Sequence, residues 1–181
     1  MLVTDPRFAG SDAWVTAKIL GRAIGALGRF DVVLTGTESV DGNTSIVPFQ
    51  LSEALDIPLL SQLHRIDIEG ATVLAERLYG HEYQRISVAL PVLIAVNREA
   101  NTVRFPALGD IKTAYEMPLE RLTMDDIGGE ESDYGLRGSP TVVVDSEVFK
   151  HRRKREVIEG TTAEKAGKLA DILKKHDIIR F

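Results

Sequence analysis

The first third of the chain alternates between strand-like and helical patterns of apolar side chains. Leu2–Thr4 predicts a short strand, and apolar residues at helical spacing predict a helix from Ala13 to about Leu27, with Trp14 expected in the core. The apolar run Asp31–Leu34 predicts a buried parallel strand, and a second helix is predicted from about Ser45 to Leu55. This order of strands and helices is typical of an α/β domain.

After Pro58 the period of the apolar pattern changes from the 3.6 residues of a helix to the two residues of a strand. Apolar and polar residues alternate in three runs, Leu63–Ile68, Thr72–Leu78 and Gln84–Leu90, which glycine-containing turn signals separate. A further apolar run follows at Pro91–Val96. This region therefore predicts an antiparallel meander followed by a more buried strand.

From Asn97 to Gly138 the chain has no sustained period, apart from a short helix predicted near Asp110–Tyr115. Long irregular stretches are unusual inside compact domains, so this one suggests an arm or a partner-binding segment. A final helix is predicted near the C-terminus, where Thr161 and Glu164 form a capping box before an apolar stripe.

Composition narrows the class of protein. The hydrophobic fraction of 44% and the charged fraction of 27% are those of a globular protein. The net charge of −5 argues against nucleic acid as the main partner, and the basic cluster Lys150–Arg155 is interpreted as a solvated or subunit-facing stretch. No signal peptide and no membrane-spanning run is recognised, and the absence of cysteine fits a reducing compartment, so a soluble cytoplasmic protein without direct membrane insertion is expected.

Catalytic and metal-binding signals are absent from the sequence. The four histidines are scattered, and none has metal-binding spacing to a carboxylate or to another histidine. Phosphate-loop, dinucleotide-binding and serine-hydrolase motifs do not occur. The neighbouring carboxylates Asp125-Asp126 and Glu130-Glu131 are interpreted as solvated loop charges. We therefore expect neither a metal site nor an enzyme active site.

The informative segment is the loop from Gly36 to Ser45, which follows a predicted parallel strand and opens into a helix. Ligands of open α/β sheets bind at this edge, and a helix N-terminus receives phosphate. Gly36 and Gly42 would let the backbone approach a ligand, and the hydroxyls of Thr44 and Ser45 add hydrogen bonds. The alternative is an ordinary strand–helix loop with a side-chain cap from Asn43 or Thr44.

Three co-linear segments resemble the β subunit of electron transfer flavoproteins. FDVVLTGTESVDGNTSIVPFQLSEALDIP resembles a strand, a G-x-x-x-x-D-G-x-T loop and a helix ending in L-x-I-P. VLAERLYGHEYQRISVALPVLIAVNREANTVRFPALGDIKTA is similar to the signature region, and GLRGSPTVVV with the following basic stretch is similar to the C-terminal arm of many prokaryotic members. The resemblance covers nearly the whole chain.

The resemblance implies a fold and a function. The fold would be a three-layer Rossmann-like, adenine nucleotide α-hydrolase-like parallel sheet extended by antiparallel strands. Residues 1–122 would form a partial nucleotide-binding domain, and residues 123–181 would form a C-terminal arm and helix for subunit docking. Family members begin with further strand–helix units before the segment matched by Met1, so this chain is expected to be N-terminally truncated: a fragment, a shortened relative, or half of a site that a partner completes.

The same resemblance implies cofactors and partners. The chain would form a heterodimer with an α subunit that holds FAD, and would pass electrons from acyl-CoA or related dehydrogenases in fatty acid oxidation while catalysing no reaction itself. It would bind AMP, or a second FAD, through a set of residues in the loop and the start of the helix: Gly36, Asp41, Gly42, Asn43, Thr44, Ser45 and Val47. Two alternatives stay open, a stand-alone adenine-nucleotide-binding module and an adenylate-handling enzyme of the same broad fold.

Two further residues match family positions for recognising a partner. Leu108 occupies the place of an exposed anchor leucine that enters a pocket on a dehydrogenase, and Arg104 lies in the same loop. The alternatives are that Leu108 packs under its own loop and that Arg104 only braces the loop through bonds to carbonyl groups.

Overall fold

The computed structural model describes residues 1–98, 100–147 and 155–179. The chain divides into two compact units, Met1–Val143 and Val144–Phe181, which are described separately below. The predicted basic cluster Lys150–Arg155 lies, except for its last residue, outside the described residues.

The order of elements in the first unit follows the predicted order closely. Its strands are β1 (Leu2–Val3), β2 (Val32–Gly36), β3 (Leu59–Glu69), β4 (Thr72–Tyr79), β5 (Glu82–Ala89), β6 (Val92–Val96) and β7 (Arg121–Leu122). Its helices are η1 (Pro6–Phe8), α1 (Ala13–Leu27), α2 (Val47–Leu55), α3 (Leu108–Glu116), α4 (Met124–Ile127), η2 (Glu131–Asp133) and α5 (Gly135–Gly138). The α/β alternation, the meander and the short helix α3 were predicted from the sequence, whereas β7, α4, η2 and α5 were not.

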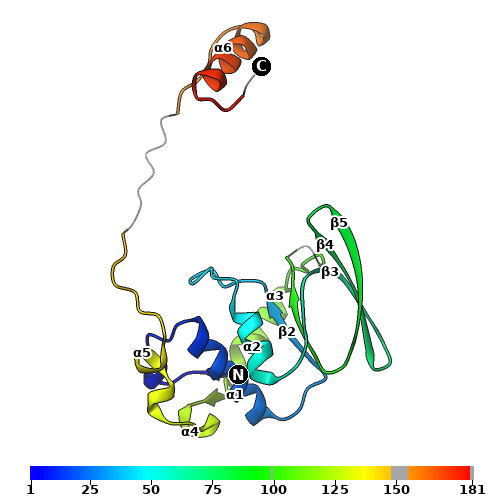
Figure 1. The fold of residues 1–181 in the computed structure, drawn as a ribbon, viewed down its shortest axis with the longest axis vertical. Helices are drawn as coiled ribbons and strands as arrows, with labels where there is room; N and C mark the ends of the chain where they lie inside the picture. Colours follow the sequence, from blue (N-terminus) through cyan, green and yellow to red (C-terminus); the bar gives the residue numbers. More distant parts are fainter. Residues whose placement is uncertain (99, 148–154, 180–181) are drawn as a thin grey trace. The chain divides into compact units, whose positions relative to one another are not determined.

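A five-stranded mixed sheet in the order β2-β6-β3-β4-β5 forms the centre of this unit (Figure 1). β2 and the first half of β3 run parallel to β6, and the second half of β3 is antiparallel to β4. The change occurs at an irregularity around Gln62, which has a φ of 58°. β3 is therefore shared between a parallel α/β sheet and an antiparallel meander, as the predicted fold requires.

Two hydrophobic clusters hold the sheet. On one face Leu93 of β6 packs with Ala17 of α1 and Leu51 of α2, and all three side chains are at most 1% exposed. On the other face Val92 and Ile94 of β6 pack with residues of β3 and β4. β6 is buried from both sides because it lies between two strands and two clusters, which explains its continuous apolar run.

The sequence-based prediction of a buried strand at Asp31–Leu34 is wrong with respect to burial. β2 pairs with β6 alone and forms the edge of the sheet, and Leu34 is 65% exposed. The strand at Leu2 does not join this sheet, since β1 pairs in parallel with β7 as a separate two-stranded sheet. The expectation that Trp14 lies in the core is also wrong: Val15 and Ala17 face the clusters, and Trp14 is left 49% exposed on the outer side of α1.

A third hydrophobic cluster joins α1 to residues that follow β7. Val15, Ile19 and Ala23 of α1 pack against Met124, Ile127 and Tyr134. The first compact unit therefore extends through residues 123–143, beyond the predicted domain boundary at 122. The assignment of residues 123–181 to subunit docking stays a prediction.

The second unit contains the helix α6 (Thr162–Lys175). Thr161 is its N-cap and exchanges hydrogen bonds with Glu164 in a capping box, as predicted. Leu169 and Ile172 on its apolar stripe are 48% and 36% exposed, so the apolar face of α6 is not buried within its own unit.

Candidate functional site

The loop between β2 and α2 lies at the carboxyl edge of the parallel part of the sheet. Gly36, the last residue of β2, is opposite Val96, the last residue of β6. The Thr37 hydroxyl donates a hydrogen bond to the Val96 carbonyl oxygen at 3.2 Å and ties the start of the loop to β6. The predicted binding loop is therefore at the position where open α/β sheets bind their ligands.

A carboxylate holds the polar residues of this loop together. The Ser45 hydroxyl donates to Glu38 Oε2 at 2.8 Å. The Asn43 amide nitrogen, in the orientation that satisfies its hydrogen bonds, is 3.0 Å from Glu38 Oε2 and 3.2 Å from Oε1. Asn43 and Ser45 both adopt positive φ, 46° and 55°, so the chain turns twice around this carboxylate. The structure thus brings together two of the predicted site residues through Glu38, which the sequence analysis did not select.

A second carboxylate organises the tip of the loop. Asp41 accepts hydrogen bonds from the Ser39 hydroxyl and from the backbone of Gly42, and these bonds lower the pKa of its carboxyl group. Asp41 is therefore ionised at neutral pH, and its carboxylate occupies the Ser39 and Gly42 donors of the loop.

The helix after the loop begins two residues later than predicted. Its N-cap is Ile46, which has no side-chain capping bond, and Val47 and Pro48 open α2. The alternative of an ordinary loop capped by Asn43 or Thr44 does not describe this geometry. The Val47 side chain packs against the cluster of Leu51 and Leu93, so a ligand at the start of α2 would contact only the Val47 backbone.

Two features of the loop fit a nucleotide, and one does not. The Thr35 hydroxyl at the end of β2 is buried without a hydrogen-bond partner, and the backbone of Gly36 is open to close approach. These groups and the polar side chains of the loop suit the hydroxyl and ring groups of a nucleoside. This segment offers no cationic side chain to a phosphate, because the sequence contains no Lys or Arg between Asp31 and His64.

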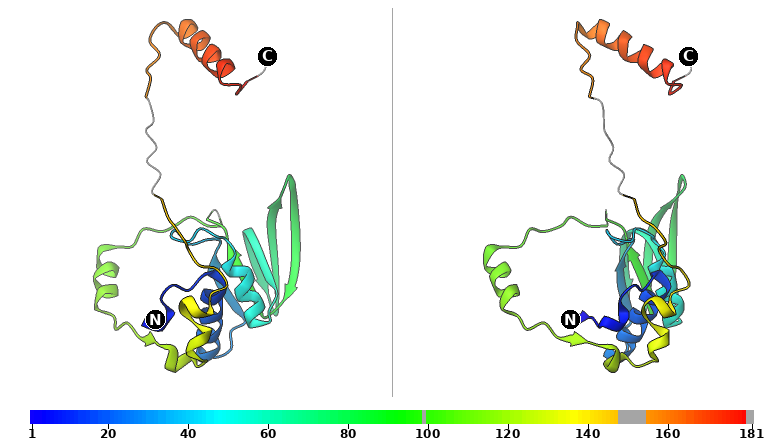
Figure 2. Two further views of the ribbon diagram at one scale, coloured as in Figure 1. Left: turned by 60° about the vertical axis from the view of Figure 1, so that its left-hand side comes forward. Right: turned by 90° about the vertical axis from the view of Figure 1, so that its left-hand side faces the viewer.

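The two predicted partner-recognition residues lie on a different segment from the loop. Leu108 is the first residue of α3 and is 84% exposed, so it does not pack under its own loop. Arg104 is exposed, and no hydrogen bond joins it to a carbonyl group of the described residues. Figure 2 shows α3 on an outward loop between β6 and β7. Leu108 is thus free to contact another molecule.

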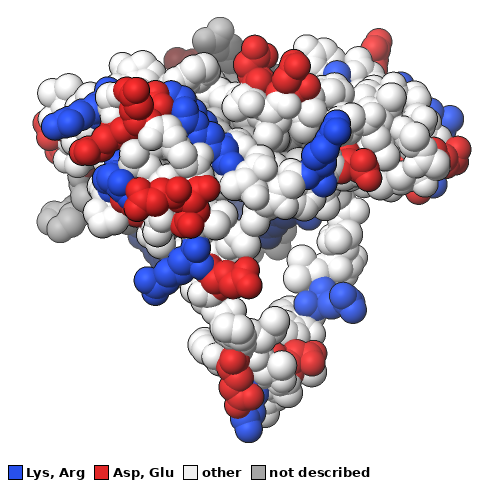
Figure 3. All heavy atoms as spheres, turned by 90° about the horizontal axis from the view of Figure 1, so that it is seen from below, with Lys and Arg blue, Asp and Glu red and all other residues white. Residues whose placement is uncertain are grey.

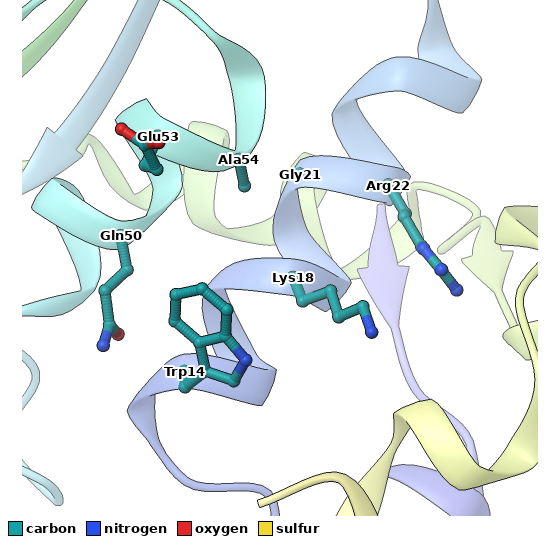
Figure 4. A pocket seen from close by; sticks show the side chains of 7 residues that line it. All are labelled: Trp14, Lys18, Gly21, Arg22, Gln50, Glu53 and Ala54. Carbon is teal, nitrogen blue, oxygen red and sulfur yellow. The ribbon is translucent and has the colours of Figure 1, made fainter. Parts of the chain in front are cut away.

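A hollow that the sequence did not predict lies between α1 and α2, with a volume of about 400 Å³. Trp14 and Gln50 point toward it from the two helices (Figure 4). Arg22 and Lys18 line it too, but both are paired with Asp133. The exposed Trp14 is the one residue that could have indicated this hollow.

Charges of both signs are interspersed on the face of the molecule in Figure 3. Within residues 1–98, 100–147 and 155–179, no cluster of acidic and histidine side chains has the form of a metal site. No helix in the same ranges has the length and apolar character needed to cross a membrane.

The comparison with known proteins decides the family. The electron transfer flavoprotein domain matches residues 1–127. The electron transfer flavoprotein subunit beta of Thermoanaerobacterium thermosaccharolyticum is 35% identical over 179 residues, which are 98% of this chain and 68% of the relative. The chain belongs to the electron transfer flavoprotein family. The resemblance noted in the sequence is therefore confirmed.

Other relatives place this family in more than one pathway. A subunit of the caffeyl-CoA reductase–Etf complex of Acetobacterium woodii is 35% identical over 98% of this chain and 68% of the relative. The acryloyl-CoA reductase electron transfer subunit gamma of Anaerotignum propionicum is 32% identical over 98% of this chain and 70% of the relative. The chain is thus a β-subunit-like component of an electron transfer flavoprotein, a carrier associated with flavin in its complex, and it pairs with an α-type partner.

Proposed function

We propose that this chain is a nucleotide-binding scaffold that pairs with an FAD-carrying α subunit in a cytoplasmic heterodimer. AMP, or a second FAD, would be held by the residues of the β2–α2 loop: Gly36, Asp41, Gly42, Asn43, Thr44, Ser45 and Val47. The observation that supports it is the place of this loop at the carboxyl ends of two parallel strands, beside the unpartnered Thr35 hydroxyl.

In this proposal the protein binds and orients, and the FAD of the complex supplies the redox step. The backbone of Gly36 and Gly42 allows the nucleotide to approach, while Asn43 and Ser45 supply hydrogen-bond donors. Residues 123–181 would dock on the α subunit, and the exposed apolar face of α6 is suited to such a contact.

The partner would be a dehydrogenase that acts on a CoA thioester. Leu108 and Arg104 would form the contact, because Leu108 is exposed at the start of a helix that makes no close packing with the sheet. Two relatives carry names of CoA-thioester reductase systems, which favours acyl-CoA or related dehydrogenases, including those of fatty acid oxidation.

Co-expression of this chain with an α subunit of the same family tests the proposal. We expect a yellow complex with a flavin spectrum, from which denaturation releases FAD together with AMP or a second equivalent of FAD. A colourless chain that binds nucleotide alone would favour the stand-alone module instead. A complex that releases FAD but no nucleotide beyond the α-subunit's share would contradict the role of the β2–α2 loop.

A further inference from the structure

We propose that the α-type subunit also binds this chain at the N-terminal end of α1. The contact surface consists of the Trp14 side chain, the hollow between α1 and α2, and the residues Val142 and Val143, all within the first unit. We call it the arm-base surface. The inference rests on the proposed function, in which the C-terminal arm docks on an α subunit, and it adds a contact that lies outside the arm.

Hydrogen bonds fix the point at which the C-terminal arm leaves the first unit. The backbone N–H and the hydroxyl of Thr141 donate to Asp12 Oδ2 at 3.0 and 2.7 Å, and the Asp12 N–H donates to Ser139 Oγ at 2.9 Å. Asp12 is also the N-cap of α1 and accepts a bond from the Val15 N–H at 3.0 Å. The chain after Thr141 therefore departs from the start of α1.

This departure point decides which partner is expected there. An α subunit that is held by the later part of the arm is tethered by the chain to the start of α1. A tether raises the effective concentration of a bound partner around its point of attachment, so even a modest second contact at this place adds to the overall affinity. A free second copy of this chain has no such advantage.

Exposed apolar side chains lie on both sides of the Asp12–Thr141 bonds. Val142 and Val143 directly follow Thr141 and are 61% and 83% exposed, and Trp14, two residues after Asp12, is 49% exposed. Apolar side chains that are exposed side by side are typical of interaction surfaces, and tryptophan is enriched among the residues that contribute most to binding. The arm-base surface therefore has an aromatic anchor and an apolar segment next to it.

The hollow beside Trp14 fits an apolar side chain of the partner. Its volume of about 400 Å³ exceeds that of any single side chain, and the Trp14 ring forms part of its wall (Figure 4). Lys18 and Arg22 line it, but their charges are paired with Asp133, and Glu53 is exposed to solvent. An apolar group can therefore enter without separating a cation from its partner.

The first test measures the affinity of the full chain for an FAD-loaded α subunit of the same family, with Trp14→Ala and Phe30→Ala. Phe30 is 47% exposed and follows the other end of α1, about 20 Å along the helix, so it is the matched control. We expect Trp14→Ala to weaken binding about thirtyfold, as loss of an aromatic anchor implies, and Phe30→Ala to leave it within twofold. Thermal midpoints of the isolated chains establish that they are folded.

A second pair of variants tests the apolar segment without touching packed residues. Val143→Asp places a charge on the arm-base surface, and Val103→Asp makes the same change at a position that is 76% exposed on the segment before α3. We expect Val143→Asp to weaken α-subunit binding about tenfold and Val103→Asp to leave it unchanged.

The outcomes separate the inference from the proposed function. If the wild-type chain binds the α subunit and either Trp14→Ala or Val143→Asp binds it equally tightly, or the controls lose as much, the inference is overturned and the heterodimer stands. If light scattering shows that the isolated chain self-associates and that Trp14→Ala alone abolishes this, the surface joins two copies and the inference is overturned. If the wild-type chain binds no α subunit, the proposed heterodimer is overturned and the inference with it.

Discussion

Two halves of one irregular stretch behave in opposite ways. Between residues 97 and 138 the sequence predicts little regular structure, and the structure places short elements from Leu108 to Gly138. In the first half, every side chain of α3 is exposed, with Leu108 and Tyr115 at 84% and 88%. In the second half, Tyr134 is 1% exposed and packs in the cluster formed with α1.

The difference lies in the contacts that each half makes. The Tyr134 ring lies 5.1 Å from the Phe8 ring, and its hydroxyl donates to the Gly128 carbonyl and receives a bond from Arg22 at 2.6 Å. The glycines that precede it fit this arrangement: Gly129 has a φ of 96°, and a Cβ there would meet the Arg22 guanidinium at 1.4 Å. The second half is therefore part of the folded core, whereas the helix of the first half is exposed to solvent.

The largest expected effect comes from breaking the packed half. Tyr134→Ala should destabilise the protein by about 3–5 kcal/mol, the range for deleting a buried aromatic ring. The measurement is the free energy of unfolding by chemical denaturation. Tyr115→Ala is the matched control, because it removes the same ring from the exposed half and should change stability by no more than about 0.5 kcal/mol. Equal losses in the two variants would contradict the contrast between the two halves.

A substitution in the exposed half should change the affinity for a partner and not the stability of the fold. Leu108→Ala should leave the unfolding free energy within about 0.5 kcal/mol of wild type and weaken binding of a cognate dehydrogenase by about 2 kcal/mol or more, which is tenfold or greater. The measurements are the thermal midpoint of the heterodimer and its rate of reduction by the dehydrogenase as a function of concentration.

Ile111→Ala is the control for Leu108→Ala, since it makes a comparable truncation on the same helix at a residue that is 39% exposed. If Leu108→Ala lowers the midpoint strongly while transfer per folded molecule is unchanged, the docking role is wrong.

Many elements of both units could be predicted from the sequence because each carries its own local pattern. Helix α1 and the meander have clear periods of 3.6 and 2, β6 is a continuous apolar run, and Thr161 with Glu164 identifies the start of α6. The position of the β2–α2 loop followed from the order of strand and helix. Each of these features is determined by residues close to it in the sequence.

The errors concern contacts between distant residues. Trp14 was placed in the core because tryptophan is usually buried, yet which side of α1 is covered depends on residues 124–134. Asp125 and Asp126 are exposed, as the sequence predicts, but they lie in the short helix α4 and not in a loop: Asp126 caps α4 through Thr123, and Asp125 pairs with Arg7. A Thr-x-x-Asp capping box at Thr123 was a usable signal for α4. Glu38 was missed because its partners depend on two positive-φ turns that the sequence does not specify.

The smallest expected effect concerns the ion pairs that fasten the packed half to α1. Asp133 accepts hydrogen bonds from Lys18 Nζ at 2.6 Å and Arg22 Nη2 at 3.0 Å. The Lys18 bond, with a backbone bond from Glu130 and the bond from Arg22, lowers the pKa of Asp133 from 3.8 to about 2. Because the folded pKa is below the unfolded one, the stabilisation is fully present above about pH 4 and is lost as the pH falls through 2.

We expect Asp133→Asn to be less stable than wild type at pH 7, by a margin that narrows between pH 4 and pH 2. Denaturation at pH 7, 4, 3 and 2 measures this margin, with Asp67→Asn as the control because its pair with Arg65 is on the exposed hairpin. A margin that stays constant over this range would show that Asp133 does not act through its charge.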